Sequence, residues 1–424
     1  MSIRNECDKK ASGGVILLTG ATGFVGRRLL SELLKQTSGT IVCLVRAASE
    51  ADAQARGREI SRNLRVVFVP ADLEKRKFGI TDLAWDTLAS RVSEIYHCAA
   101  SVSFDLPLEE SRRINVVGTQ SLLSLALSAA THGHFCRFHH VSTAYVAGKK
   151  RGVVSPDYLP DHRDSSKFRN SYEQSKAEAE SLLRNQSEVP VSIYRPSIIT
   201  GDTHNGATDN FNVLYVPMRL ISRGTLPFIP AGSSSSLDCI GVDYVVRGIV
   251  ALGKTSEGVC DSFHLTAGKN CFDICDFVRV SNEVASQVHQ LPDENCRVIP
   301  YWCWKALQLS ANLAQLAPAQ FKQLRRWGKL IARFSRGLSA FDSYTHVNTV
   351  FECATEQAQL ASAQVTQPPA LDYLRIITEY AMLADFGAAE LSTQAAIVER
   401  VRDSSLRTAG IDIRSHATPA GAQA

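Results

Sequence analysis

Residues 19–26 of the chain read TGATGFVG. They follow an apolar run, Val15–Thr19, that is expected to be a strand, and they open an amphipathic stretch, Phe24–Gln36, that is expected to be a helix. Three glycines at this spacing permit a tight turn, a close approach of the backbone to a pyrophosphate, and close packing of helix on strand; they are Gly20, Gly23 and Gly26. The first amides of the helix would face the phosphate charge. The stretch predicts a dinucleotide-binding loop, with an ordinary glycine-rich turn as the alternative.

Outward from this loop, short apolar runs alternate with amphipathic stretches as far as residue 200. The further runs expected to be strands are Ile41–Val45, Val66–Val69, Glu94–Cys98, Phe138–Ser142 and Val191–Tyr194. Helical periodicity with little Gly or Pro runs through Leu106–Ala130 and Ser171–Arg184. Short β-branched runs between polar segments are typical of buried parallel strands. The pattern predicts an α/β fold with a doubly wound, mostly parallel Rossmann sheet.

The sequence pattern changes after residue 200, where Gly, Asn, Ser and Pro interrupt the alternation of apolar runs with amphipathic stretches. We expect a smaller substrate lobe there and a helical C-terminal extension after it, because apolar residues again recur at helical spacing. The predicted segments are a flexible N-terminus (1–13), a nucleotide-binding Rossmann domain (14–200), a substrate lobe with strands returning to the core (201–270), a helical region (271–402) and a disordered tail (403–424).

Composition excludes several classes of protein. The 424 residues carry 46 Lys and Arg against 42 Asp and Glu, a balance of +4 that does not indicate a nucleic-acid partner. The 11 cysteines form no paired Cys-x-x-Cys framework, so free thiols in a reducing compartment and no metal site are expected. The first residues do not have the pattern expected of a signal peptide, and no apolar run is long enough to span a membrane. A cytoplasmic protein is the expectation.

Arg46 decides which cofactor the loop would favour. It lies twenty residues after Gly26, where an Asp or Glu would bind the ribose 2′-hydroxyl of NAD and an Arg suits a 2′-phosphate. No acid lies between Glu32 and Glu50, and Arg27 is the other cation nearby. NADPH is therefore predicted over NADH, with a solvated arginine at a strand end as the alternative.

Asp72 and Leu73 follow the third strand, where they could take the adenine edge. An ordinary surface turn explains the same two residues.

Tyr172 and Lys176 lie four residues apart in YEQSK, so they would be neighbours on one face of a helix. A cation beside a phenol, whose ordinary pKa is about 10, favours the phenolate. Upstream, HVSTAY at residues 140–145 ends the fifth strand at the sheet edge where α/β proteins bind ligands, and a hydroxyl there can donate to a substrate carbonyl. An exposed amphipathic pairing is the alternative for Tyr172 and Lys176.

These motifs together resemble the extended short-chain dehydrogenase/reductase family over residues 14–265. The resemblance rests on TGATGFVG, on HCAASVSF at residues 97–104, on NVVGT at 115–119, on VSTAY at 141–145 and on YEQSK. Within the family the chain is most similar to the thioester reductase and fatty acyl-CoA reductase branch, through CLVRA, VSTAYVAG, YRPSIITGDTHNG at 194–206 and LDCIGVDYVV at 238–246.

The resemblance implies a role for each matching residue. Thr143 would be the hydroxyl of a catalytic triad, with Ser142 as the competing assignment. Tyr172 would be the acid, and Lys176 would hold the nicotinamide ribose and lower the tyrosine pKa. Asn115 would support the site or cap a helix start. The remaining cofactor contacts would come from Thr22, Phe24, Val25, Ala99, Ala100, Ser101, Pro196 and Ile198.

The resemblance also implies an activity, the NADPH-dependent reduction of an acyl thioester to an aldehyde, with a second hydride giving the alcohol. The substrate would arrive as acyl-CoA or on a separate acyl carrier protein. The glycine loop and triad are shared with NAD(P)-dependent epimerases, dehydratases and ketone reductases, which are the alternative enzymes. A non-catalytic redox sensor or scaffold is the third, although such proteins often lose the Tyr or Lys that are both present here.

A basic segment lies outside these motifs. No acid occurs between Glu294 and Asp342, while eight cations do: Arg297, Lys305, Lys322, Arg325, Arg326, Lys329, Arg333 and Arg336. Apolar residues recur at helical spacing from Phe321 to Phe334, which predicts a basic amphipathic helix over 321–336. Its apolar face could dock on the protein, its cations could bind an acidic carrier protein or CoA phosphates, or the helix could contact an anionic membrane.

Overall fold

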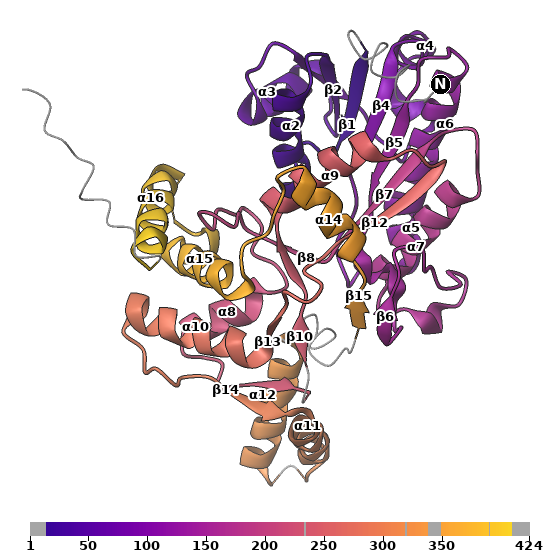
Figure 1. Ribbon diagram of the computed structural model, residues 1–424. Coiled ribbons are helices and arrows are strands. Elements are labelled where there is room, and N and C mark those ends of the chain that lie inside the picture. The colour runs from indigo at the N-terminus through magenta and orange to yellow at the C-terminus, as the bar shows by residue number, and fades with distance from the viewer. Residues whose placement is uncertain (1–13, 233–234, 319, 338–348, 390, 409–424) are drawn as a thin grey trace, which may run out of the picture. The chain divides into compact units, whose positions relative to one another are not determined.

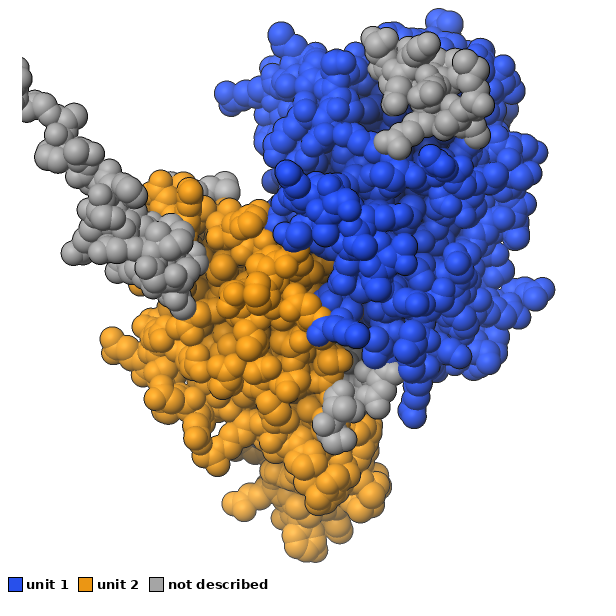
Figure 2. Space-filling model, viewed as in Figure 1, with its two compact units in different colours: residues 1–199, 242–269, 349–366 blue, residues 200–241, 270–348, 367–424 orange. Residues whose placement is uncertain are grey.

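The computed structural model describes residues 14–232, 235–318, 320–337, 349–389 and 391–408, and the predicted N-terminal segment 1–13 lies outside them. The chain forms two compact units (Figure 2). Unit 1 comprises residues up to 199 together with 242–269 and 349–366. Unit 2 comprises residues 200–241, 270–348 and those from 367 onward. Each unit is therefore assembled from separate stretches of the sequence.

Unit 1 is built on a seven-stranded sheet whose neighbouring strands all pair in parallel (Figure 1). In spatial order its strands are β3 (Val66–Pro70), β2 (Thr40–Val45), β1 (Val15–Thr19), β4 (Val92–His97), β5 (Arg137–Val141), β7 (Val191–Pro196) and β12 (Cys260–Leu265). The order reverses between β1 and β4, and this switch point is where doubly wound sheets bind ligands, at the carboxyl ends of the strands. The predicted Rossmann fold is confirmed.

The strands form because their apolar runs are covered on both faces. Every residue of β1 is buried, and a hydrophobic core includes Leu17, Phe138 and Ile193 from three different strands. The helices of unit 1 are α2 (Phe24–Gln36), α3 (Glu50–Ile60), α4 (Asp82–Ala89), α5 (Leu108–Arg112), α6 (Gly118–Ala130), α7 (Ser171–Arg184), α9 (Val242–Thr255) and α14 (Ala354–Ser362). A short parallel pair, β6 (Gly152–Val154) and β15 (Thr349–Phe351), joins distant parts of the same unit.

One predicted helix is interrupted. Residues 106–130 were expected to form a single helix, but α5 and α6 are separated by a π turn, Arg113–Val117. Asn115 lies in this turn and uses its side chain on residues outside the helix. A widened turn of this kind is frequent at functional sites.

Unit 2 contains most of the C-terminal helices. They are α8 (Tyr215–Ser222), α10 (Ile274–His289), α11 (Tyr301–Gln315), α12 (Lys322–Gly337), α15 (Ala370–Leu383) and α16 (Leu391–Thr408). Its strand pairs are β10 (Ser236–Leu237) with β13 (Phe272–Asp273) and β9 (Phe228–Ala231) with β14 (Arg297–Pro300). The helix α16 continues to Thr408, six residues into the segment predicted to be a disordered tail, and the rest of that segment lies outside the described residues.

In the described part of the chain, no helix is long and apolar enough to cross a membrane. The ten cysteines described there are all free. Among the same residues, no group of three or more His, Cys, Asp or Glu side chains is arranged to hold a metal ion.

Candidate active site

The glycine loop between β1 and α2 has the geometry of a nucleotide cradle. Gly20 has a φ of +74°, and a Cβ there would lie 2.7 Å from the backbone nitrogen of Ala99. A Cβ on Gly26 would lie 2.1 Å from the carbonyl oxygen of Gly20, so helix and loop pack too closely for any side chain. Gly23 caps α2 with no side-chain hydrogen bond, and the first turn carries no acid. The backbone amides at the N-terminus of α2 are therefore suited to bind a pyrophosphate, which is the role that the sequence predicts for this loop.

Four of the predicted cofactor contacts lie in the loop and the first turn of α2. Thr22 and Arg27 are exposed, and Phe24 and Val25 are half-buried. The guanidinium of Arg28 lies 4.4 Å from the centre of the Phe24 ring. Ala99, Ala100 and Ser101 lie two to four residues after the end of β4, which brings them beside the loop because β4 pairs with β1.

Arg46 shares its partner with a second arginine that the sequence did not single out. Arg46 follows β2, and its Nη2 donates to Glu74 Oε1 at 2.7 Å, while Arg113 Nε donates to Glu74 Oε2 at 2.6 Å. Both guanidinium groups are more than half exposed, so they remain accessible to a dianion. The predicted single cation is one half of a two-arginine cluster around one carboxylate.

Asp72 and Leu73 have structural partners. The carboxylate of Asp72 accepts from the backbone amide of Glu74 at 3.1 Å, which closes a turn after β3. Leu73 is partly buried against the core, and its Cβ would lie 3.5 Å from a Cβ placed on Gly118. Both residues lie after β3, where the sequence expected a turn or an adenine contact.

Thr143 and Ser142 follow β5, and the structure separates their roles. Ser142 Oγ donates to the buried Glu180 carboxylate at 2.5 Å. Thr143 instead lies beside the phenol of Tyr172, where its hydroxyl tends to lower the tyrosine pKa, and its Oγ1 donates to the carbonyl of Pro196 at 3.4 Å. The hydroxyl beside Tyr172 is therefore that of Thr143, and Ser142 is occupied elsewhere.

The Tyr172 phenol is protonated at neutral pH. Burial raises its pKa to about 12, and the nearby hydroxyl of Thr143 only partly opposes that rise. The described contacts of Lys176 are with other groups, and its expected effect on the tyrosine pKa stays a prediction. The ring of Phe104 lies 5.8 Å from the Tyr172 ring, centre to centre, and covers one side of it.

Lys176 points back toward β5. Its Nζ donates to the carbonyl of Val141 at 2.8 Å and lies 3.2 Å from Nε2 of His140. Burial lowers the pKa of Lys176 to about 8 and holds that of His140 well below its ordinary value, so His140 is neutral and its Nε2 accepts. The Nδ1 atom of His140 has no partner among the described residues. Lys176 has three donors, of which these contacts use two.

A buried ion pair behind the site was missed by the sequence. Glu180 and Arg195 are both fully buried and are joined by bonds of 2.5 and 3.1 Å. Arg195 also donates to the carbonyls of Pro156 and Tyr158. The pair connects α7, β7 and, through Ser142, the end of β5. Glu180 lies four residues after Lys176 on the same helical face, and that spacing is the signal that could have found it.

Asn115 supports the same region. Its Oδ1 accepts from the amide of Ser101 at 2.8 Å, and its Nδ2 donates to Ser175 Oγ on α7 at 2.9 Å. It therefore ties the loop after β4 to the helix that carries Tyr172, and it does not cap a helix start.

Pro196 ends β7, and Ile198 lies half-buried two residues later. With the loop after β1 and the residues after β4 and β5, they place the predicted site residues at the carboxyl edge of one sheet.

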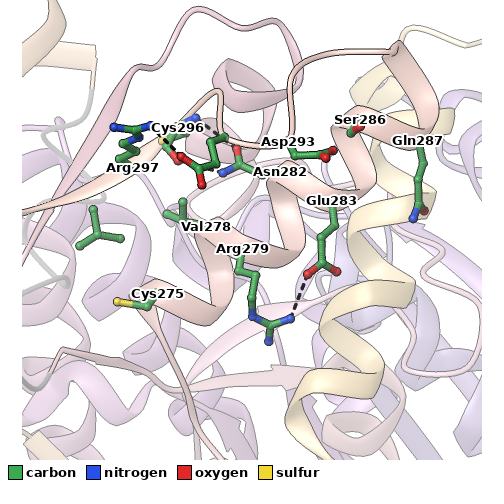
Figure 3. Close-up of a pocket in the computed structure, with 12 residues that line it drawn as sticks. Cys275, Val278, Arg279, Asn282, Glu283, Ser286, Gln287, Asp293, Cys296 and Arg297 are labelled. Carbon is green, nitrogen blue, oxygen red and sulfur yellow. Dashed lines mark hydrogen bonds and ion pairs between the residues drawn. The ribbon is translucent and has the colours of Figure 1, made fainter.

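A concave region lies on unit 2, away from the predicted site in the sequence, and contains none of the predicted site residues (Figure 3). It is lined by α10 and by the residues that lead into β14. Both of its arginines are paired with carboxylates, Arg279 with Asp276 and Glu283, and Arg297 with Glu294. The cations of this open groove are therefore already neutralised within the protein.

A parallel sheet with a glycine cradle after β1 and a tyrosine and lysine on α7 defines an NAD(P)-dependent oxidoreductase of the Rossmann type. The family model described as male sterility protein, an NAD-binding one, matches residues 18–249, which is more than half of the chain. The chain therefore belongs to the male sterility protein family. The resemblance to the thioester reductase branch is confirmed at this level.

Comparisons with individual proteins agree. The chain is 33% identical over 278 residues to a component of the linear gramicidin synthase of Brevibacillus parabrevis, covering 62% of this chain and 5% of that protein. It is 26% identical over 365 residues to Aldehyde reductase lnaA of Aspergillus flavus, covering 81% and 34%. A crystal structure of the terminal R domain from the myxalamid PKS-NRPS pathway is 25% identical, with a TM-score of 0.67 over 91% of this chain and 98% of that one. The chain thus spans only a minor part of the curated relatives.

Proposed function

We propose that the chain is an NADPH-dependent reductase of acyl thioesters, delivered as acyl-CoA or on an acyl carrier protein. The observation that carries the proposal is that the Thr143 hydroxyl lies beside the buried phenol of Tyr172 at the carboxyl end of β5, in the same unit as the glycine cradle. Relatives named as a linear gramicidin synthase component and as an aldehyde reductase support a reductase that acts at the carbonyl level of oxidation.

The residues fit hydride transfer to a carbonyl. Bound NADPH would supply a hydride to the thioester carbonyl carbon. Thr143 and Tyr172 would donate hydrogen bonds to the carbonyl oxygen as negative charge develops there. Tyr172 is protonated at neutral pH, so it can give that oxygen a proton. The resulting hemithioacetal collapses to an aldehyde and a free thiol, and a second round would give the alcohol.

Lys176 would act on the cofactor side of the site. Two of its donors are directed to Val141 and His140, and the third is suited to a ribose hydroxyl. Because burial lowers its pKa to about 8, the ammonium is held charged near neutral pH but not far above it.

The preference for NADPH over NADH rests on Arg46 and Arg113. A 2′-phosphate carries more charge than the Glu74 carboxylate that these arginines share, and guanidinium groups bind phosphate with two donors each. In a fluorescence titration, Arg46→Ala and Arg113→Ala should each weaken NADPH binding about tenfold and leave NADH binding unchanged. Equal effects on both nucleotides would contradict the assignment.

The activity is tested by following NADPH oxidation with acyl-CoA and with acyl carrier protein substrates, and by identifying aldehyde and alcohol. Tyr172→Phe should lower kcat roughly 10²- to 10⁴-fold with NADPH binding retained. Undiminished activity of that variant would overturn the mechanism. Turnover of a ketone or a sugar nucleotide, with none of any thioester, would favour the epimerase and ketone reductase alternative. Binding of NADPH without any turnover would favour a sensor.

A further inference from the structure

The helices α11 and α12 of unit 2 pack on each other as a hairpin (Figure 1). They meet through small residues: a Cβ on Gly328 would lie 2.6 Å from the carbonyl oxygen of Ala311 and 3.2 Å from Cβ of Ala314. Gln315 Nε2 also donates to the carbonyl of Gly328 at 3.3 Å. Because small residues make this contact, the large apolar side chains of both helices are free to point elsewhere.

The outward face of α11 is apolar. Trp302, Leu309 and Leu313 are 73%, 63% and 62% exposed, and Leu316 just after the helix is 81% exposed. Their spacings of seven, four and three residues place them on one helical face, opposite the buried Trp304, Ala311 and Ala314. A soluble helix ordinarily shows polar residues on this face.

The basic helix α12 also exposes large apolar groups. Phe321, which precedes it, and Leu324 and Trp327 within it are exposed, although the sequence offered burial of this face as one explanation. Lys322, Arg326 and Lys329 are exposed as well. The side chains of Arg333, Phe334 and Arg336 lie outside the described residues. Burial against the protein does not account for Phe321 and Leu324, whereas Ile331 on the same helix is half-buried.

The charged side chains of the hairpin are all positive. No Asp or Glu occurs in residues 301–337, and the described cations include Lys305 on α11 and four on α12. A partner of this surface must offer an apolar layer next to negative charge. We propose that the α11–α12 hairpin docks on an anionic lipid bilayer, with the apolar face in the acyl boundary and the cations at the headgroups.

A bilayer fits this surface better than a protein partner does. An acidic protein would match the cations of α12, but the outward face of α11 has four large apolar groups and one cation, Lys305, to offer it. Tryptophan and leucine beside lysine and arginine are the composition of helices that lie in a membrane interface. This docking does not depend on the proposed activity.

The test is co-sedimentation of the full chain with vesicles of phosphatidylcholine alone and of phosphatidylcholine with phosphatidylserine. Binding is expected only to the anionic vesicles and should weaken with salt. The double variant Leu309→Gln and Leu313→Gln should lower the partition coefficient about tenfold or more, since each removes a buried leucine from the bound state. Arg326→Gln with Lys329→Gln should lower it about tenfold, because each cation near an anionic surface contributes to binding.

Matched variants in unit 1 are the controls. Leu64→Gln with Leu83→Gln removes two exposed leucines, and Arg58→Gln with Arg62→Gln removes two exposed cations; neither should change binding. Circular dichroism checks that every variant is folded. Absence of binding to anionic vesicles, or equal losses in hairpin and control variants, would overturn the proposal. A dimer abolished by Leu309→Gln and Leu313→Gln, or binding of an acidic carrier protein in place of vesicles, would also overturn it.

Discussion

The helices α7 and α11 break the ordinary pattern of burial in opposite directions. On α7 the charged residues Glu173, Lys176 and Glu180 are buried. On α11 the apolar residues Trp302 and Leu309 are exposed. Burying a charged group costs free energy, which only specific polar partners offset. Exposing large apolar groups to water also costs free energy, which contact with another surface offsets. Both departures from a stable packing pattern therefore indicate function rather than folding.

The buried charges of α7 are each held by partners. Glu173 accepts from the backbone amide and the guanidinium of Arg169, and its own amide is bonded to the side chain of Asn170. Glu180 is held by Arg195 and Ser142. The helix is consequently positioned by polar contacts, which constrain direction more tightly than apolar packing does.

Loss of the buried ion pair should have the largest effect. Glu180→Ala leaves the guanidinium of Arg195 buried without its carboxylate, and we expect it to lower the free energy of unfolding by about 3–5 kcal/mol. Urea unfolding followed by circular dichroism measures the change.

Glu178→Ala on the same helix is the matched control. Glu178 also pairs with an arginine through two bonds of 2.8 Å, but Arg112 is 38% exposed. Solvent screens that pair, so its loss should cost about 1 kcal/mol or less. Equal losses in the two variants would mean that burial does not distinguish α7 from an ordinary surface helix.

The second contrast lies within α11 itself. Trp304 is 1% exposed and its ring lies 5.9 Å from that of Phe228, whereas Trp302, two residues earlier, is 73% exposed. Trp304→Ala should lower the free energy of unfolding by about 3–5 kcal/mol through loss of packing. Trp302→Ala should change it by no more than about 0.5 kcal/mol. Circular dichroism is the appropriate signal, because both variants alter fluorescence. A large loss at Trp302 would show that its ring is part of the core of unit 2.

Elements with a clear apolar pattern could be predicted from the sequence. The structure gives β1, α2 and α7 the residue bounds expected for them. The helix α3 was not predicted, because only Ala53 and Gly57 are buried on it. A Cβ on Gly57 would lie 2.1 Å from the Phe68 ring, so this helix packs through its backbone and shows no apolar stripe in the sequence.

The site could be predicted where its residues are close in the sequence. The spacing of the loop glycines predicts a tight turn against a helix. The four-residue spacing of Tyr172 and Lys176 predicts that both lie on one face of a helix. Arg113 and Glu74 are 39 residues apart, and Glu180 and Arg195 are 15 apart, so only the fold brings them together. The raised pKa of Tyr172 also depended on the fold, because it follows from burial of the phenol.

The smallest expected effect is a shift in pH dependence, which tests whether the buried charges of α7 act on one another. Burial lowers the pKa of Lys176 to about 8, while the negative charge of Glu180 opposes that fall. Lys176 loses its proton as the pH rises through about 8, so kcat/KM for NADPH should fall on the alkaline side from that point. Glu180→Gln removes the charge that favours the ammonium and should move this limb to lower pH by about one unit. Glu178→Gln should leave it in place. If the alkaline fall in kcat/KM occurs at the same pH in the unmodified protein, in Glu180→Gln and in Glu178→Gln, then Glu180 holds α7 in position without setting the charge of Lys176.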